Sequence, residues 1–395
     1  MSVLTERISD LERRYIDQVL DAGFRSSAGN LMTAELEREF AARFDSKFAI
    51  SFCNGTATMH AALVAAGVGP GDEVLVPPLT MSSTTFAVLH AGATPVFADI
   101  DPATWTIDPL SVRERMSPRT KAVIPVSLYG LAPDMDSIMQ IAEDHGLFVL
   151  EDDAECFLGQ YRDRVVGSIG HASSFSFQSS KHLTCGEGGM VTTNDEELAR
   201  RIRQFGSLGY AAVGAAAGKS KISKSEIQDP SYLRHSTIGF NYRMSELCAA
   251  VARGQLERIE ELVGVRVGAA KAYEEARGGC EWLRPQATPG DRVHSYWTYV
   301  VALDGSAGIA WRQFRDTYVK LGGDPVYGAW QLTYLEPAMR GERLSATQSQ
   351  VFDSGLCPIA EATQPSLLQF KTNYWQSADA NRAADALART IEALS

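Results

Sequence analysis

A lysine and an aspartate stand beside predicted strands in an order that suits an aldehyde cofactor. Asp152 ends the apolar run that begins at Val149, and Lys181 follows the run 173–177 after a short polar turn. A lysine amine can condense with an aldehyde, and a carboxylate can keep a pyridine nitrogen protonated so that the ring accepts electrons. The two residues therefore predict a pyridoxal phosphate site, with Lys181 as the amine and Asp152 as the carboxylate.

The segment Asn54-Gly55-Thr56-Ala57 could bind the phosphate of such a cofactor. It lies between a predicted strand and a predicted helix, and a helix N-terminus presents several N–H groups to an anion. A Gly-Thr pair at a helix start also occurs for purely structural reasons, and an acidic run such as 151–153 can be a solvated strand end. The hypothesis therefore depends on the order of the three segments, which is phosphate turn, carboxylate and lysine.

Short apolar runs alternate with helical patterns between residues 47 and 194. This alternation predicts a mainly parallel sheet covered by helices, in which ligands bind at the carboxyl ends of the strands. The predicted helices span 56–66, 83–91 and 135–144, and the predicted strands span 48–52, 73–76, 94–98, 122–128, 147–150, 173–177 and 190–193.

The second half of the chain has a different organisation. Residues 214–229 have weak periodicity and predict a mobile surface loop, and a long helix is predicted from 245 to 277. A strand over 297–303 and helices over 311–321 and 380–394 follow it. We therefore expect a large domain with an N-terminal arm over residues 1–250, and a linking helix with a smaller domain over residues 251–395.

The composition excludes several classes of protein. The 395 residues carry a formal net charge of −11, which disfavours nucleic acid as a partner. Six cysteines contain no CxxC pair, and the histidines have no metal-ligand spacing, so we expect reduced thiols and no metal. The sequence has no signal-peptide pattern and no apolar run of transmembrane length, which predicts a cytoplasmic protein without a membrane partner.

With these segments in view, the chain resembles the DegT/DnrJ/EryC1/StrS family, the sugar aminotransferases of the fold-type I pyridoxal phosphate enzymes. The resemblance runs through nearly the whole length and is carried by six motifs in order. These are 54–57 (NGTA), 77–80 (PPLT), 151–155 (EDDAE), 176–181 (SFQSSK), 186–189 (GEGG) and 239–244 (GFNYRM).

The resemblance implies an α/β fold with a mainly parallel seven-stranded sheet and a smaller C-terminal α/β domain. It implies that Lys181 forms the Schiff base and then shuttles protons, that Asp152 pairs with the pyridine nitrogen, and that Gly55, Thr56 and Ser176 hold the phosphate. Asn241 is similar to the family asparagine that reaches the phosphate in the neighbouring subunit, which implies a homodimer with shared active sites. The implied reaction moves an amino group from glutamate or glutamine to a keto-sugar, usually nucleotide-linked, or to a keto-cyclitol.

Three positions depart from the family pattern. Met81 replaces the aromatic residue that usually stacks on the pyridine ring, although its polarizable sulfur can cover a ring face. Glu155 stands where the family commonly has Gln or His near the cofactor hydroxyl. His182 follows the lysine, and related sugar dehydratases carry histidine at the lysine position. Counting five residues back from Gly186 gives Lys181, so transamination is favoured over dehydration.

The acceptor site is less well defined by the sequence. Aromatic and polar residues in the segment 327–334 could line it, chiefly Tyr327 and Trp330 and also Gln331 and Tyr334, although aromatic residues there could equally be core residues. Gln178 is reminiscent of relatives that act on keto-cyclitols. The loop lysines Lys219, Lys221 and Lys224 could meet a nucleotide diphosphate or simply be solvated.

Two further functions remain open at this point. A dehydratase of the same family would use the same cofactor to remove a sugar hydroxyl, and the presence of Lys181 argues against it. A regulator would bind the cofactor without turnover and would usually carry a DNA-binding segment, for which the N-terminal stretch is too short.

Overall fold

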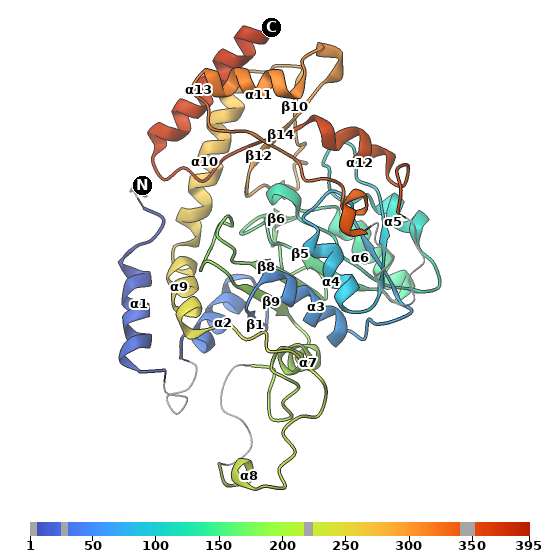
Figure 1. The fold of residues 1–395 in the computed structure, drawn as a ribbon, viewed down its shortest axis with the longest axis vertical. Helices are drawn as coiled ribbons and strands as arrows, with labels where there is room; N and C mark the ends of the chain where they lie inside the picture. Colours follow the sequence, from blue (N-terminus) through green and yellow to red (C-terminus); the bar gives the residue numbers. More distant parts are fainter. Residues whose placement is uncertain (1–5, 25–30, 217–223, 340–351) are drawn as a thin grey trace.

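The computed structural model describes residues 6–24, 31–216, 224–339 and 352–395 (Figure 1). Helix α1 (Asp10–Asp21) begins at a capping box, in which the Ser9 hydroxyl accepts the Leu11 N–H and the Glu12 carboxylate accepts the Ser9 N–H at 2.8 Å. Helices α1 and α2 (Leu31–Arg43) both pack on α9 (Glu246–Leu256). The N-terminal arm is thereby attached to the centre of the molecule.

A seven-stranded sheet forms the core of the larger part. Its strand order is β1-β9-β8-β5-β4-β2-β3, and β9 is antiparallel to both of its neighbours while the remaining neighbouring pairs are parallel. The predicted mainly parallel sheet is therefore confirmed. The strands are β1 (Phe48–Phe52), β2 (Glu73–Val76), β3 (Thr94–Phe97), β4 (Thr120–Val123), β5 (Phe148–Asp152), β8 (Ala172–Ser176) and β9 (Gly189–Thr193).

Alternate residues of these strands enter different cores, as the two-residue period of a strand requires. Val74 and Val76 pack into the core cluster that also holds Ile50 and Phe52, whereas Leu75 packs into a cluster on the opposite face. The first face is covered by α3 (Gly55–Ala65), α4 (Ser83–His90) and α7 (Glu196–Gly206). The other face is covered by α2 and α9 together with α5 (Pro109–Arg115) and α6 (Met135–His145).

A predicted strand and a predicted helix are shorter in the structure than expected. The strand expected over 122–128 ends at Val123, and the chain then forms a 3₁₀ turn at Leu128–Gly130, where Tyr129 has a φ of 61°. The helix expected over 245–277 is interrupted between α9 and α10 (Ile259–Arg277). At the interruption Arg258 leaves helical dihedral angles, and its guanidinium lies 3.3 Å from the buried Glu12 of α1. A tertiary contact with the arm thus coincides with the break.

A second, antiparallel sheet lies beyond α10. Its order is β10-β12-β14-β13, and α10, α11 and α13 pack with it around a separate core cluster. This smaller part has the expected α/β character, while the domain boundary at residue 250 remains a prediction. The elements are β10 (Leu283–Pro285), β12 (Tyr299–Leu303), β13 (Tyr327–Gly328), β14 (Leu367–Phe370), α11 (Trp311–Lys320) and α13 (Ser377–Leu394).

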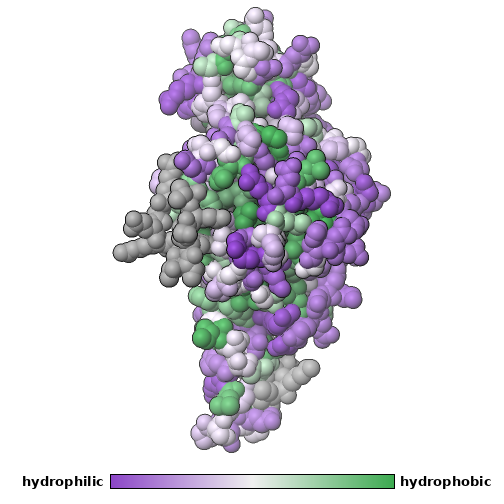
Figure 2. All heavy atoms as spheres, turned by 90° about the vertical axis from the view of Figure 1, so that its right-hand side faces the viewer, coloured by the Kyte–Doolittle hydropathy of each residue, from purple (hydrophilic) through white to green (hydrophobic). Residues whose placement is uncertain are grey.

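Smaller elements complete the described chain. A three-stranded sheet joins β6 (Gln160–Tyr161), β7 (Arg164–Val165) and β11 (Arg292–Val293), and α12 (Pro358–Thr363) precedes β14. The predicted surface loop 214–229 contains a short helix, α8 (Lys224–Gln228), at the end of the molecule opposite α13 (Figure 1), and residues 217–223 lie outside the described chain. Figure 2 presents a face largely covered by hydrophilic side chains. Within the described ranges, the helices are too short or too polar to cross a membrane.

Candidate active site

Three segments that the sequence singled out meet at one edge of the large sheet. Strands β1 and β8 both run antiparallel to β9, and β8 runs parallel to β5, so β1, β5 and β8 point the same way. Their carboxyl ends lead to Gly55, Asp152 and Lys181 respectively. The structure thus brings the predicted phosphate turn, carboxylate and amine to the edge where open α/β sheets bind ligands.

The start of α3 forms a cradle for an anion. Asn54 caps the helix by accepting the Ala57 N–H at 2.8 Å, and the first N–H groups of any helix have no intrahelical acceptor. A Cβ atom added to Gly55 would lie 2.9 Å from the Cβ of Ser176, so glycine allows β8 to approach the helix closely. Gly55, Thr56 and Ser176 therefore fit a phosphate group.

Asp152 is a buried carboxylate held by two hydrogen bonds. The Thr84 hydroxyl donates to one of its oxygens at 2.7 Å and the Ala154 N–H to the other at 3.3 Å. Burial raises the pKa of Asp152, while these hydrogen bonds and the charge of Lys181 act in the opposite direction. A buried carboxylate is stabilised by a cation at its side, so the residue fits the protonated nitrogen of a pyridine ring.

The Lys181 amine is enclosed by an acid and an aromatic ring. Its Nζ lies 3.3 Å from the Oε1 of Glu155 and 4.5 Å from the centre of the Trp297 ring, and the side chain is 11% exposed. The other Glu155 oxygen accepts the Tyr129 N–H at 3.0 Å. Burial raises the pKa of Glu155, and the charge of Lys181 counteracts that shift. Glu155 thus contacts the amine itself.

His182 points away from this site. It is fully buried, and its Nε2 lies 3.0 Å from the backbone oxygen of Ser295. Burial lowers the pKa of His182 well below its usual value, and the charge of Arg266 lowers it further. The side chain beside Asp152 and Glu155 is therefore that of Lys181, as counting back from Gly186 predicts.

Met81 and Asn241 are both exposed in this single chain. Met81 follows β2 at the same sheet edge and is 49% exposed. Asn241 accepts a hydrogen bond from the Arg243 guanidinium at 2.9 Å and precedes α9. Their predicted contacts with the cofactor, in the same subunit for Met81 and in a neighbouring subunit for Asn241, remain predictions.

The residues proposed for the acceptor occupy different surroundings. Trp330 stacks on Trp297 with ring centres 5.8 Å apart, and the Trp297 ring in turn contacts the Lys181 amine. Gln178 folds onto its own turn, where its side chain accepts the Ser180 N–H at 2.7 Å. Tyr327 is 68% exposed on β13. Their role in substrate binding remains a prediction.

The remaining residues suggested for the acceptor site lie in the core, on the surface or outside the described chain. Tyr334 is a core residue, because it is fully buried against Phe97 and its hydroxyl bonds to Glu361. Gln331 is exposed and accepts the Leu332 N–H. Lys219 and Lys221 lie outside the described residues, as does the side chain of Lys224.

Sequence reasoning missed two side chains that contact the site. Trp297 covers the lysine amine from the start of the smaller part, 116 residues beyond Lys181 in the numbering, and Thr84 hydrogen-bonds Asp152 from the first turn of α4. Thr84 lies four residues after the PPLT motif, which was a usable signal. Trp297 had no such signal, because only the tertiary fold brings it to the lysine.

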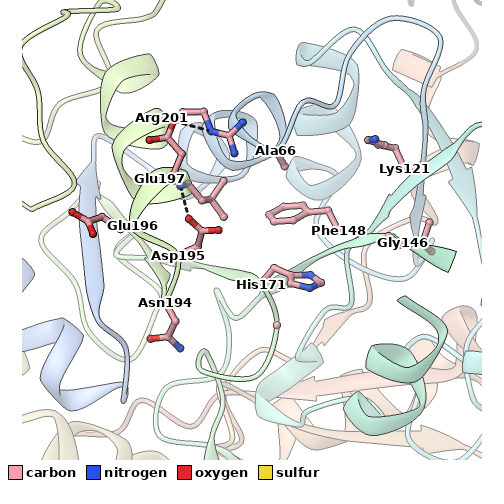
Figure 3. Close-up of a pocket in the computed structure, with 13 residues that line it drawn as sticks. Ala66, Lys121, Gly146, Phe148, His171, Asn194, Asp195, Glu196, Glu197 and Arg201 are labelled. Carbon is pink, nitrogen blue, oxygen red and sulfur yellow. Dashed lines mark hydrogen bonds and ion pairs between the residues drawn. The ribbon is translucent and has the colours of Figure 1, made fainter. Parts of the chain in front are cut away.

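A surface hollow of about 750 Å³ lies elsewhere (Figure 3). Its lining includes Lys121 of β4 and Phe148, the first residue of β5, so it opens at the amino ends of these strands, opposite Lys181. Glu197 and Arg201, 3.8 Å apart, border it. The residues predicted for the site do not line it, and the chemistry described above belongs to the other edge.

Comparisons with known proteins identify the family of the chain. The model of the DegT/DnrJ/EryC1/StrS aminotransferase family matches residues 6–345. The chain is 39% identical over 306 residues to GDP-perosamine synthase of Caulobacter vibrioides, covering 77% of each protein. The solved aminotransferase from Psychrobacter cryohalolentis has a TM-score of 0.86 and 30% identity over 98% of both chains. DesV of S. venezuelae, solved in complex with a ketimine intermediate, has a TM-score of 0.82 and 30% identity over 96% of this chain and 94% of its own.

These neighbours confirm the expected fold-type I architecture, and the first of them is solved as an aminotransferase. The family match covers the phosphate cradle, Asp152, Lys181 and Asn241. The chain belongs to the DegT/DnrJ/EryC1/StrS aminotransferase family.

Proposed function

We propose that the protein uses pyridoxal phosphate to transfer an amino group from glutamate or glutamine to a keto-sugar linked to a nucleotide. One observation carries the proposal. The amine of Lys181 is enclosed by Glu155 and Trp297 at the sheet edge that also holds Asp152 and the start of α3. An amine, a buried carboxylate and an anion cradle at one edge match the three parts of that cofactor.

When bound, pyridoxal phosphate supplies an aldehyde that condenses with amines and a protonated ring that withdraws electrons from the adjoining carbon. The side chains of this protein supply the rest. Asp152 holds the proton on the ring nitrogen, while Gly55, Thr56 and Ser176 hold the phosphate. Met81, at the end of the segment after β2, covers a ring face with its thioether.

Lys181 acts as the base once its amine is released. In the first half-reaction its Nζ would take a proton from the donor carbon that bears the nitrogen and pass it to the cofactor carbon. In the second half-reaction it would move a proton the opposite way, from the cofactor carbon to the acceptor carbon. Glu155 Oε1, at 3.3 Å, keeps the released amine within reach and carries charge opposite to the ammonium form. The Trp297 ring covers the amine and excludes water from it.

The acceptor class is supported by one relative and one pair of rings. The relative is the GDP-perosamine synthase, whose name denotes a nucleotide-linked amino sugar. The stacked rings of Trp297 and Trp330 present aromatic faces near the Lys181 amine, a surface suited to a sugar ring. Gln178 and Tyr327 complete the proposed acceptor site. A keto-cyclitol is the alternative acceptor.

We further propose a homodimer with shared active sites. Large apolar side chains flank Asn241 on the surface of the single chain, where Ile238 is 88% exposed and Phe240 is 46% exposed. Apolar surface of this kind is typical of a subunit interface. In the dimer, Asn241 donates to the phosphate bound by the partner subunit.

The experiment joins a covalent test to a product test. The purified protein is loaded with pyridoxal phosphate, reduced with borohydride and mapped by peptide mass spectrometry, with modification expected at Lys181. The loaded protein is then incubated with glutamate or glutamine and with nucleotide keto-sugars or keto-cyclitols. The masses of the products are measured by mass spectrometry. Modification elsewhere, or a product that has lost a hydroxyl without gaining an amine, would overturn the proposal in favour of another site or of dehydration.

A further inference from the structure

The turn that carries Lys181 is held by cations through its backbone. The carbonyl of Ser179 accepts a hydrogen bond from Arg7, the carbonyl of Ser180 accepts one from Arg266 at 2.7 Å, and the carbonyl of Lys181 accepts from Arg7 at 2.7 Å and from Arg266 at 3.1 Å. The Trp297 indole N–H also donates to Ser180 at 3.0 Å. Three consecutive carbonyls therefore face two guanidinium groups.

Arg266 is an unusual residue for a protein interior. It is 2% exposed, and its hydrogen bonds go to backbone carbonyls and to the Thr372 hydroxyl. Neither Arg266 nor Arg7 belongs to an ion pair among the described residues. A buried charge without a charged partner is costly, and burial lowers the pKa of Arg266 to about 9. By contrast, the half-buried Arg203 is paired with Glu37 at 2.7 Å.

The other contacts of Arg266 lie in the smaller part of the molecule. Its Nη1 donates to the carbonyl of Trp297 at 2.6 Å and to the hydroxyl of Thr372 at 3.3 Å. The Thr372 hydroxyl in turn donates to the Trp297 carbonyl at 2.7 Å. One planar group on α10 therefore joins the lysine turn to the residues beside β12 and β14.

We propose that Arg266 is a positioning residue for Lys181, which it holds by the backbone carbonyls of its turn while it fixes Trp297 beside the lysine amine. With its carbonyls directed at the guanidinium groups, the turn sends the Lys181 side chain toward Glu155. Arg7 assists from the N-terminal arm. The inference rests on the proposed function only for the chemical role of Lys181.

The guanidinium shape is needed for this task. Arginine presents donors in a flat fork, so Arg266 can bond the lysine turn from one nitrogen and Trp297 from the other. A lysine ammonium keeps the charge but concentrates its donors at one point. The conservative change Arg266→Lys therefore separates the fork geometry from the charge.

The experiment measures how fast Lys181 becomes modified in cofactor-free protein. Pyridoxal phosphate is added, samples are reduced with borohydride at intervals, and peptide mass spectrometry follows modification at Lys181. We expect Arg266→Lys to slow this modification roughly tenfold, since a small displacement of a reacting group has effects of at least that size. The variant Arg203→Lys, at an arginine remote from the lysine, should lower the melting temperature without changing the rate.

Each outcome decides a separate question. Unchanged modification in a folded Arg266→Lys protein would refute the positioning role. If Arg266→Lys does not fold, Arg7→Gln provides the test, because Arg7 is the half-buried arginine of the pair. This variant should slow modification of Lys181 severalfold, and an unchanged rate would refute the inference. If the unaltered protein is not modified at Lys181, the proposed function fails instead, and the two failures are thereby distinguished.

Discussion

The amine of Lys181 lies 3.3 Å from the carboxylate oxygen of Glu155, and both side chains are almost fully buried. Because both groups are buried, their attraction is screened far less than that of a surface pair. Glu155 is therefore well placed to determine the position of the Lys181 amine after its release.

Replacing Glu155 with glutamine tests that contact. Gln keeps an oxygen for the Tyr129 N–H but removes the charge that attracts Lys181. We expect kcat for amine transfer to fall roughly tenfold, less than the roughly 100-fold or more that a positioned acid–base group itself contributes, because Glu155 only places the base, with KM for the acceptor little changed. Steady-state kinetics measures both. The control Glu37→Gln, at a buried acid paired with Arg203, should lower stability and leave kcat unchanged.

Gly55→Ala tests the phosphate cradle. The added Cβ would lie 2.9 Å from Ser176 Cβ, so α3 and β8 must separate, at a cost of about 1–3 kcal/mol. We expect a lower melting temperature and a pyridoxal phosphate Kd raised roughly tenfold, since about 1.4 kcal/mol is one decade. Absorbance titration and thermal melting measure these. Gly69→Ala, whose Cβ would meet no atom within 4 Å, is the matched control. Equal Kd values for the two variants would contradict the cradle.

Substitutions of Trp297 separate its ring from its N–H group. Trp297→Phe keeps an aromatic face over the Lys181 amine and loses the bond to Ser180, whereas Trp297→Ala loses both. A desolvated contact of a cation with a ring is worth about 2 kcal/mol, or roughly thirtyfold. We expect kcat to fall by about that factor in Trp297→Ala and only a few-fold in Trp297→Phe. Similar losses in both would mean that the N–H group matters and the ring does not. Trp282→Phe, in the core beside Phe314, serves as control.

Asp153 predicts a pH dependence of stability. It is fully buried, and burial and then the charge of Glu151 raise its pKa well above the usual value. A carboxyl with a raised pKa stabilises the fold while protonated, so this contribution is present below the ordinary aspartate pKa and is lost as the pH rises through the raised one. Cofactor-free protein should therefore lose melting temperature as the pH rises from the ordinary aspartate range through the raised pKa of Asp153.

The variant Asp153→Asn stays neutral over the whole range and can still accept the Ser127 hydroxyl. Its melting temperature should fall less than that of the unaltered protein over the same pH interval. Part of the dependence of melting temperature on pH should remain in this variant, because the pKa values of Asp152 and Glu155 are also raised. Asp316→Asn, at an exposed aspartate, should leave the slope as it is. A slope unaffected by Asp153→Asn would refute the assignment.

The candidate site was predicted from local signals in the sequence. Gly55, Asp152 and Lys181 each follow a predicted strand, and parallel strands bring their carboxyl ends together, so strand order alone placed them at one edge. The same signals could not find Trp297 or Arg266. Arg266 lies on α10 and Trp297 just before β12, so only tertiary packing brings them to the lysine turn, and their local sequence carries no motif.

For the aromatic residues of segment 327–334, the sequence could not predict which side chains face the site. Trp330 and Tyr334 are four residues apart, yet Trp330 stacks near the lysine while Tyr334 is fully buried against Phe97. The irregular path between them, including the 3₁₀ turn Thr333–Leu335, sets the direction of each side chain. Without a regular period in that segment, the sequence cannot tell which side chain faces the site.

The antiparallel course of β9 has a consequence for altering this enzyme. Because β8 and β9 pair as one hairpin from Ala172↔Thr193 to Ser176↔Gly189, the intervening residues 177–188 leave and rejoin the sheet at the same edge. This stretch can be exchanged with that of another family member without changing the strand order, provided that the replacement keeps the backbone carbonyls that Arg7 and Arg266 contact. The position of the Lys181 amine can thus be altered without changing any of the connections between parallel strands.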